Sequence, residues 1–178
     1  MTKSGNLWAI GYDDMGRANQ VRDEIVRLVW DKHYLLLDDV AVVVRHPDGS
    51  FTFDREAFPA ASNVLGCGVV GFLAGLVLGA PLTGATIGAM VGGAGTAVAV
   101  SASVGIGDDF IGEVKEMMKP GTSAIFVLDD EGDMDVILHK IRGLGGMVLK
   151  TNVDLERAQL IQSTLAAPSA QTNKSDDK

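Results

Sequence analysis

The sequence predicts an α+β fold, a ferredoxin-like split βαβ sandwich with a glycine-rich apolar helical hairpin inserted between its two halves. The first observation is an internal echo, in which a strand-like segment ending in Asp-Asp, a helical segment and a second strand-like segment occur twice. The two copies are LWAIGYDD with VAVVVR, and AIFVLDDEGD with MVLKT. Two such units in one chain are typical of the split βαβ arrangement, whose crossovers are right-handed. The second observation is that the 51 residues 57–107 carry no charged side chain. Such a block has to be hidden from water.

The first half is predicted to contain a strand, a helix and a β-hairpin. Ala18, Val21 and Ile25 recur at three- and four-residue steps, which is typical of an amphipathic helix. β-Branched residues favour a strand, and His-Pro-Asp-Gly-Ser favours a turn. The predicted elements are a strand at 7–12, a helix at 15–30, a strand at 40–44, a turn at 46–50 and a returning strand from 51.

The second half is predicted to alternate helices and strands. Asp-Asp pairs precede three of the predicted helices of the chain, where carboxylates suit helix N-termini. The predicted elements are a helix at 108–118, a strand at 123–128, a helix at 134–142, a strand at 146–150 and a helix at 154–165.

Pro81 divides the uncharged block into two helices, 59–80 and 82–106. At about 1.5 Å per residue they reach roughly 33 and 37 Å, enough to cross a bilayer core of about 30 Å. An even number of crossings returns the chain to the side it left. This favours a hairpin that projects from the polar domain and leaves both polar halves together. A hairpin buried in the core of a soluble protein is the alternative.

Small residues recur along both predicted helices at four-residue spacing, the pattern of a glycine zipper. Glycine inside a helix costs about 1 kcal/mol, so a series of glycines needs a compensating gain. Close approach of helix backbones supplies such a gain. We therefore expect these glycines to pack helices within the hairpin and between copies of the chain, as a homo-oligomer. They are Gly71, Gly75, Gly79, Gly84, Gly88, Gly92 and Gly93.

These assignments give a predicted domain organisation. Residues 1–56 and 107–167 form a discontinuous ferredoxin-like domain, residues 57–106 form the hairpin insertion, and residues 168–178 form a disordered tail.

Composition excludes several classes of function. A net charge of −8 argues against nucleic acid as a partner and against electrostatic binding to anionic lipid. One cysteine, Cys67, excludes an intrachain disulfide and is expected to be a small packing residue. The three histidines have no metal-ligand spacing, and no nucleophile or phosphate-binding loop is present. We therefore predict no enzymatic activity, no catalytic residue, no metal and no cofactor.

Several segments together resemble a known bacterial family. They are AIGYDD, DVAVVVR, the glycine-rich hairpin, GDDFI, KPGTSA and GGMVL, in that order over about residues 7–165. This pattern resembles the family of predicted membrane proteins called domain of unknown function 1269. The resemblance implies no activity and no catalytic residues.

Two functions follow as expectations. In the first, the chain is a non-enzymatic membrane-associated or self-assembling protein, whose hairpin enters a bilayer or packs between copies. Its polar domain is expected on the cytoplasmic side, because the N-terminus has no apolar stretch of signal-peptide type. In the alternative, the chain is a cytoplasmic, soluble, oligomeric module with a small-ligand binding or regulatory function, and the hairpin is buried between subunits.

Overall fold

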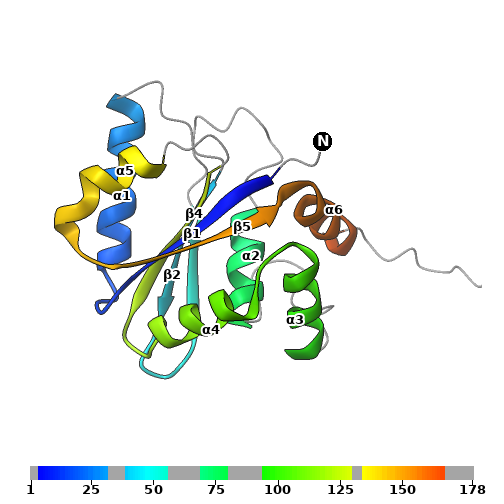
Figure 1. Cartoon of the computed structure of the whole chain (residues 1–178). Helices are drawn as coiled ribbons and strands as arrows, with labels where there is room; N and C mark the ends of the chain where they lie inside the picture. Colours follow the sequence, from blue (N-terminus) through cyan, green and yellow to red (C-terminus); the bar gives the residue numbers. More distant parts are fainter. Residues whose placement is uncertain (1–3, 32–38, 56–68, 80–93, 130–133, 167–178) are drawn as a thin grey trace, which may run out of the picture.

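The computed structural model describes residues 4–31, 39–55, 69–79, 94–129 and 134–166 (Figure 1). Outside the uncharged block, helices and strands follow one another in the predicted order, and most of their boundaries agree within two residues. The elements are β1 (Ser4–Tyr12), α1 (Arg17–Asp31), β2 (Asp39–Arg45), β3 (Phe51–Arg55), α2 (Val69–Leu78), α3 (Ala94–Ser103), α4 (Asp108–Met117), β4 (Ser123–Asp129), α5 (Met134–Ile141), a 3₁₀ turn (Arg142–Leu144), β5 (Met147–Asp154) and α6 (Leu155–Ala166).

The five strands form one sheet in the order β3-β2-β4-β1-β5, and every neighbouring pair is antiparallel. The predicted pairing of 7–12 with 123–128 is confirmed, because Leu7 lies opposite Leu128 and Tyr12 lies opposite Ser123. The sequence prediction of a mixed α+β fold is therefore correct. Every residue of β4 is buried, as expected of a central strand covered on both faces.

Helices cover both faces of the sheet (Figure 1). On one face, α1 and α5 pack over Trp8, Ile10 and Tyr12 of β1. On the other face, α2, α4 and α6 pack over the intervening side chains, including Leu7 and Ala9. This division follows from the alternation of side chains along a strand.

The described part of the uncharged block departs from the predicted hairpin. Every residue of helix α2 (Val69–Leu78) is buried, and the helix contacts β2, β4, α4 and α6. The prediction that this helix projects from the domain is therefore wrong. The physical reason is that a helix that is apolar on all sides can be buried in a core as well as in a bilayer.

Helix α3 packs against α2 and ends at Ser103, three residues before the predicted end at 106. Among the described residues, no helix combines the length and the apolarity that crossing a membrane requires. The predicted transmembrane helices thus find no support in these parts of the chain.

Candidate functional site

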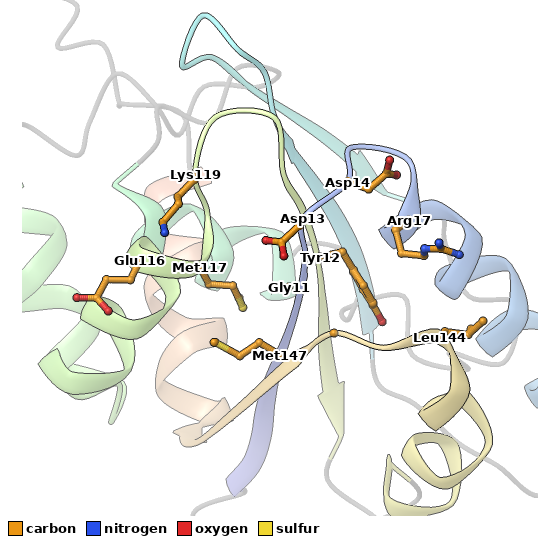
Figure 2. Close-up of a pocket in the computed structure, with 11 residues that line it drawn as sticks. Gly11, Tyr12, Asp13, Asp14, Arg17, Glu116, Met117, Lys119, Leu144 and Met147 are labelled. Atoms are coloured by element: carbon orange, nitrogen blue, oxygen red, sulfur yellow. The ribbon is translucent and has the colours of Figure 1, made fainter.

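A pocket of about 480 Å³ lies where β1 ends (Figure 2). Its walls come from the turn between β1 and α1, the end of α4, and the segment that leads into β5. The lining residues are Gly11, Tyr12, Asp13, Asp14, Arg17, Glu116, Met117, Lys119, Leu144, Gly146 and Met147.

The turn between β1 and α1 is fixed by hydrogen bonds from its own chain and from β4. The Asp14 carboxylate accepts the N–H of Gly16 at 2.8 Å. The buried Ser123 hydroxyl donates to the carbonyl of Asp14 and accepts the N–H of Ala18 at 3.2 Å. The first N–H groups of a helix lack an acceptor within the helix, so a β4 side chain satisfies one of them here.

Tyr12 forms the inner wall of the pocket. Its side chain is only 6% exposed, and its hydroxyl has no hydrogen-bond partner among the described residues. Burial raises the pKa of Tyr12 to about 12, against the smaller, opposite influence of the Arg17 charge. The phenol therefore stays protonated and able to donate a hydrogen bond at neutral pH.

A glycine turn lies along the edge of the Tyr12 ring. A Cβ on Gly146 would lie 2.7 Å from Cε1 and 3.0 Å from Cζ of Tyr12, and Gly146 has a φ of +108°. Gly145 before it has a φ of +74° and no heavy atom near its Cβ position. Only glycine allows the chain to pass so close to the ring in this conformation.

Two methionines give the pocket an apolar side. A Cβ on Gly11 would lie 2.1 Å from Cγ and 2.2 Å from Sδ of Met117, so the missing side chain makes room for this methionine. Met147 projects toward Met117 from the β5 side (Figure 2) and is 58% exposed. Methionine is flexible and polarisable, and such side chains adapt to irregular apolar groups.

Charges of both signs line the rim. Asp13, Glu116 and Lys119 are exposed, and none of them forms a side-chain hydrogen bond or an ion pair with a described residue. Arg17 donates to the Gln20 side chain at 3.1 Å. The rim can therefore meet both a cationic and an anionic group of a bound molecule.

One residue of each of two acidic pairs accepts a backbone N–H group near the start of a helix, Asp14 before α1 and Asp129 before α5. Asp129 accepts the N–H of Met134 at the start of α5, at 3.3 Å. Helix α4 differs from the prediction, because Gly107 is its N-cap and Asp108 and Asp109 lie in its first turn without a capping side-chain bond. Within the described ranges, no three His, Cys, Asp or Glu side chains are placed to hold a metal ion.

The structure places three of the seven predicted packing glycines. Gly71 and Gly75 are buried in α2, and Gly79 follows this helix with a φ of +61° and open space at its Cβ position. The other four predicted glycines lie outside the described residues, as does Cys67. The role of these glycines in oligomerisation stays a prediction.

Sequence reasoning missed the pocket. Its residues come from three separate stretches of the chain, and none of them forms a recognisable motif. Gly145-Gly146 before a strand and Asp13 after one were the available signals, since both fall at strand ends.

The comparisons with known proteins give one match. The sequence model of a family described as "Protein of unknown function (DUF1269)" matches residues 64–166, which is more than half of the chain. Neither a curated protein nor a solved structure matches the chain.

Proposed function

The chain belongs to the DUF1269 family, and we propose that it is a non-enzymatic protein that assembles with copies of itself through its uncharged helices. The observation that carries this proposal is the surface of α3. This helix lies on the outside of the helical layer, beyond α2 (Figure 1).

Helix α3 is ten residues long and has no charged side chain. Ala99 and Ala102 are exposed on it, and Val100 is half-buried. The centres of protein interfaces are depleted of charge, and small side chains let helix backbones approach closely. A helix that exposes such small, uncharged side chains is suited to packing against another helix.

The predicted zipper glycines Gly88 and Gly92 precede α3 in the sequence. We expect the double substitution Gly88→Leu and Gly92→Leu to break the homo-oligomer while the α+β domain stays folded. Light scattering after size-exclusion chromatography measures the mass, and circular dichroism checks the fold. A monomeric wild-type protein, or an unchanged mass in the variant, would contradict the proposal.

The same uncharged block supports membrane association, as a second form of the proposal. With a net charge of −8, only apolar attachment is available to the chain. We expect the protein in the membrane fraction of its native cells, with the polar domain cytoplasmic, resistant to salt and carbonate and released by detergent. Full recovery in the supernatant without detergent would reject this form and leave assembly in the cytoplasm.

The order of the strands supports a finer assignment of the fold. We assign the core to the ferredoxin-like class, because β4 lies between β1 and β2 while β1 lies between β4 and β5. Helix α1 connects β1 to β2, helix α5 connects β4 to β5, and the two helices contact each other. Strand β3 is then an added edge strand. An experimental structure with α1 and α5 on opposite faces would contradict the assignment.

A second candidate function is a small-ligand binding or regulatory module, favoured by the pocket at the end of β1. A volume of about 480 Å³ falls within the range of about 300–1,000 Å³ that is usual for ligand sites. The test is a thermal-shift screen of small organic acids and amines against the wild type and Met147→Trp, which fills the pocket. The absence of any compound that stabilises only the wild type would contradict this function.

A further inference from the structure

We propose that the chain forms a two-fold symmetric dimer in which the outer edge of β5 pairs, antiparallel, with β5 of a second copy. In the sheet, β5 has one neighbour, β1, so its other edge is an end of the sheet. The pairing joins the five-stranded sheets of the two copies into one continuous sheet. This interface is separate from the assembly through α3 proposed above.

The direction of the backbone groups along β5 follows from two contacts at its far end. The N–H of Asp154 donates to the carbonyl of Val104 at 2.9 Å, and a Cβ on Gly105 would lie 3.4 Å from the carbonyl oxygen of Asn152. The backbone groups of Asn152 and Asp154 therefore point away from β1. This direction alternates along a strand of an antiparallel ladder. The N–H and C=O groups of residues 148 and 150 consequently point outward as well.

The outer edge of β5 is open at these two residues. The outward groups of Val148 and Lys150 have no backbone hydrogen-bond partner among the described residues. None of the residues 147–152 is buried, and the exposed fractions of Met147 and Val148 are 58% and 43%. An open strand edge of this kind is a template for pairing with another strand.

The usual protections of an edge strand are weak in β5. Proteins protect such edges with proline, with a bulge or with charged side chains. The strand contains no proline, and it pairs with β1 without a bulge. Its charged residue in the open part, Lys150, lies over the Trp8 ring of its own sheet, with Nζ 4.5 Å from the ring centroid. The lysine therefore leaves the edge itself accessible.

The length of the open edge matches the strand that a second copy offers. The segment of Val104 and Gly105 covers the edge from Asn152 onward, which leaves residues 147–151 open. In a second copy, β5 begins at Met147, and the two glycines before it have positive φ, which ends the extended conformation. A copy whose Met147 lies opposite Thr151 therefore fills the open part, and its chain turns away where the covered part begins.

The backbone groups agree with this register. With Met147 opposite Thr151, residue Leu149 lies opposite its own counterpart on the symmetry axis, and Val148 lies opposite Lys150. Because Val148 and Lys150 carry the outward groups, each such pair exchanges two hydrogen bonds. Leu149 is half-buried at the margin of the core beneath α4 and α6, so its counterpart covers an apolar side chain.

Neighbouring registers are disfavoured. A shift by two residues in one direction places Lys150 opposite its own counterpart, and like charges directly opposite each other are destabilising. A shift by two residues in the other direction places Gly146, which precedes the strand, opposite Lys150. A shift by one residue sets outward groups against inward ones and loses the hydrogen bonds. The strand is thus complementary to itself in one register.

Cysteine cross-linking of the full-length chain tests both the pairing and the register. The natural Cys67 is first replaced by alanine, and disulfides are then formed with oxidised glutathione and read on a non-reducing gel. Opposed residues that are not hydrogen-bonded to each other have Cα atoms about 4.5 Å apart, which is within the range of a disulfide. Leu149→Cys should therefore run mostly as a disulfide-linked dimer.

Two further cysteines give a matched control on the same strand. Met147→Cys and Thr151→Cys should each stay monomeric on the gel, because about 13 Å of strand separates each residue from its own counterpart. An equal mixture of the two variants should form a dimer, because residue 147 lies opposite residue 151. Gln20→Cys, exposed on α1, measures linking by random collision.

Two added substitutions separate this interface from the assembly through α3. Val148→Pro removes an N–H that β1 does not use, and proline is tolerated at such a place on an edge strand. It should abolish the linking of Leu149→Cys, whereas Ala102→Glu on α3 should leave this linking unchanged. Circular dichroism checks that each variant is folded.

Each claim can fail by itself. Equal linking of Leu149→Cys and Gln20→Cys, or unchanged linking after Val148→Pro, would overturn the pairing of β5. Linking of Thr151→Cys alone as strong as in the mixture would overturn the register. Loss of linking with Ala102→Glu would show that α3 brings the strands together. None of these results alters the mass expected from assembly through α3.

Discussion

Tyr12 combines burial with an unsatisfied hydroxyl, a combination that is unfavourable in the absence of a ligand. A buried polar group without a partner costs about 1–3 kcal/mol, and the hydroxyl has none among the described residues. Its neighbours nevertheless accommodate the ring closely, because Gly146 has no side chain that would collide with it. Such local conflicts are expected at functional sites, where stability is given up for binding.

Tyr12→Phe should therefore stabilise the unliganded protein. Removing the unpaired hydroxyl should raise the free energy of unfolding by about 1 kcal/mol, measured by urea denaturation at pH 8. A loss of stability would show that the hydroxyl has a favourable partner.

The same residue gives a pH dependence. Its pKa rises from about 10 in the unfolded chain to about 12 in the folded one. The folded state thus holds the phenol proton more tightly, and this contribution to stability is complete below pH 10 and is lost as the pH rises to about 12. The wild type should lose more stability than Tyr12→Phe between pH 10 and 12 in thermal unfolding. Parallel curves for the two proteins would contradict the pKa shift.

The two glycines beside Tyr12 form a matched pair. Gly145 has φ +74° and ψ −161°, a region almost restricted to glycine, so Gly145→Ala should cost about 1–3 kcal/mol. Gly146→Ala adds a collision with the Tyr12 ring and should be more destabilising. Chemical denaturation of both variants measures the two losses of stability. Equal losses would show that the Tyr12 ring moves aside at little cost.

At the scale of elements, hydrogen bonds from the start of β4 to the start of α1 position the turn that forms one wall of the pocket. Ser123 bonds both Asp14 and Ala18, so it holds the turn that carries Asp13. The sequence showed Ser123 as the first residue of a strand, but it gave no sign that this residue satisfies a helix more than a hundred positions earlier.

Ser123→Ala should destabilise the protein by about 1–3 kcal/mol, because it leaves the buried N–H of Ala18 and the partly buried carbonyl of Asp14 without their partner. Ser103→Ala is the control, since the Ser103 hydroxyl bonds only the carbonyl of Val100 in its own helix. This control should change stability by less than about 0.5 kcal/mol. Equal effects of the two substitutions would contradict the role given to Ser123.

Periodicity predicted most helices and strands because each exposes one face and buries the other. It did not fix the place of α2, whose residues are apolar on every side. Hydropathy alone does not distinguish a core helix from a membrane helix, and the decision is made by the contacts of α2 with β2 and β4. The pocket was missed for a related reason, since only the folded chain brings Asp13 and Glu116 to one rim.

At the scale of the whole molecule, α2 and α3 differ from the other helices in charge. The helices α1, α4, α5 and α6 carry charged residues, whereas α2 and α3 have none. Burial against the sheet accounts for the composition of α2. It does not account for the exposed Ala99 and Ala102 of α3, whereas self-assembly would cover them.

The most direct test is sedimentation equilibrium of the full-length chain without detergent, for the wild type, Ala102→Glu and Gln20→Glu. Each substitution adds one negative charge at an exposed helix position, on α3 for Ala102 and on α1 for Gln20. We expect an oligomer for the wild type and Gln20→Glu, and a smaller mass for Ala102→Glu. A monomeric wild type, or the same mass for all three proteins, would contradict assembly through α3.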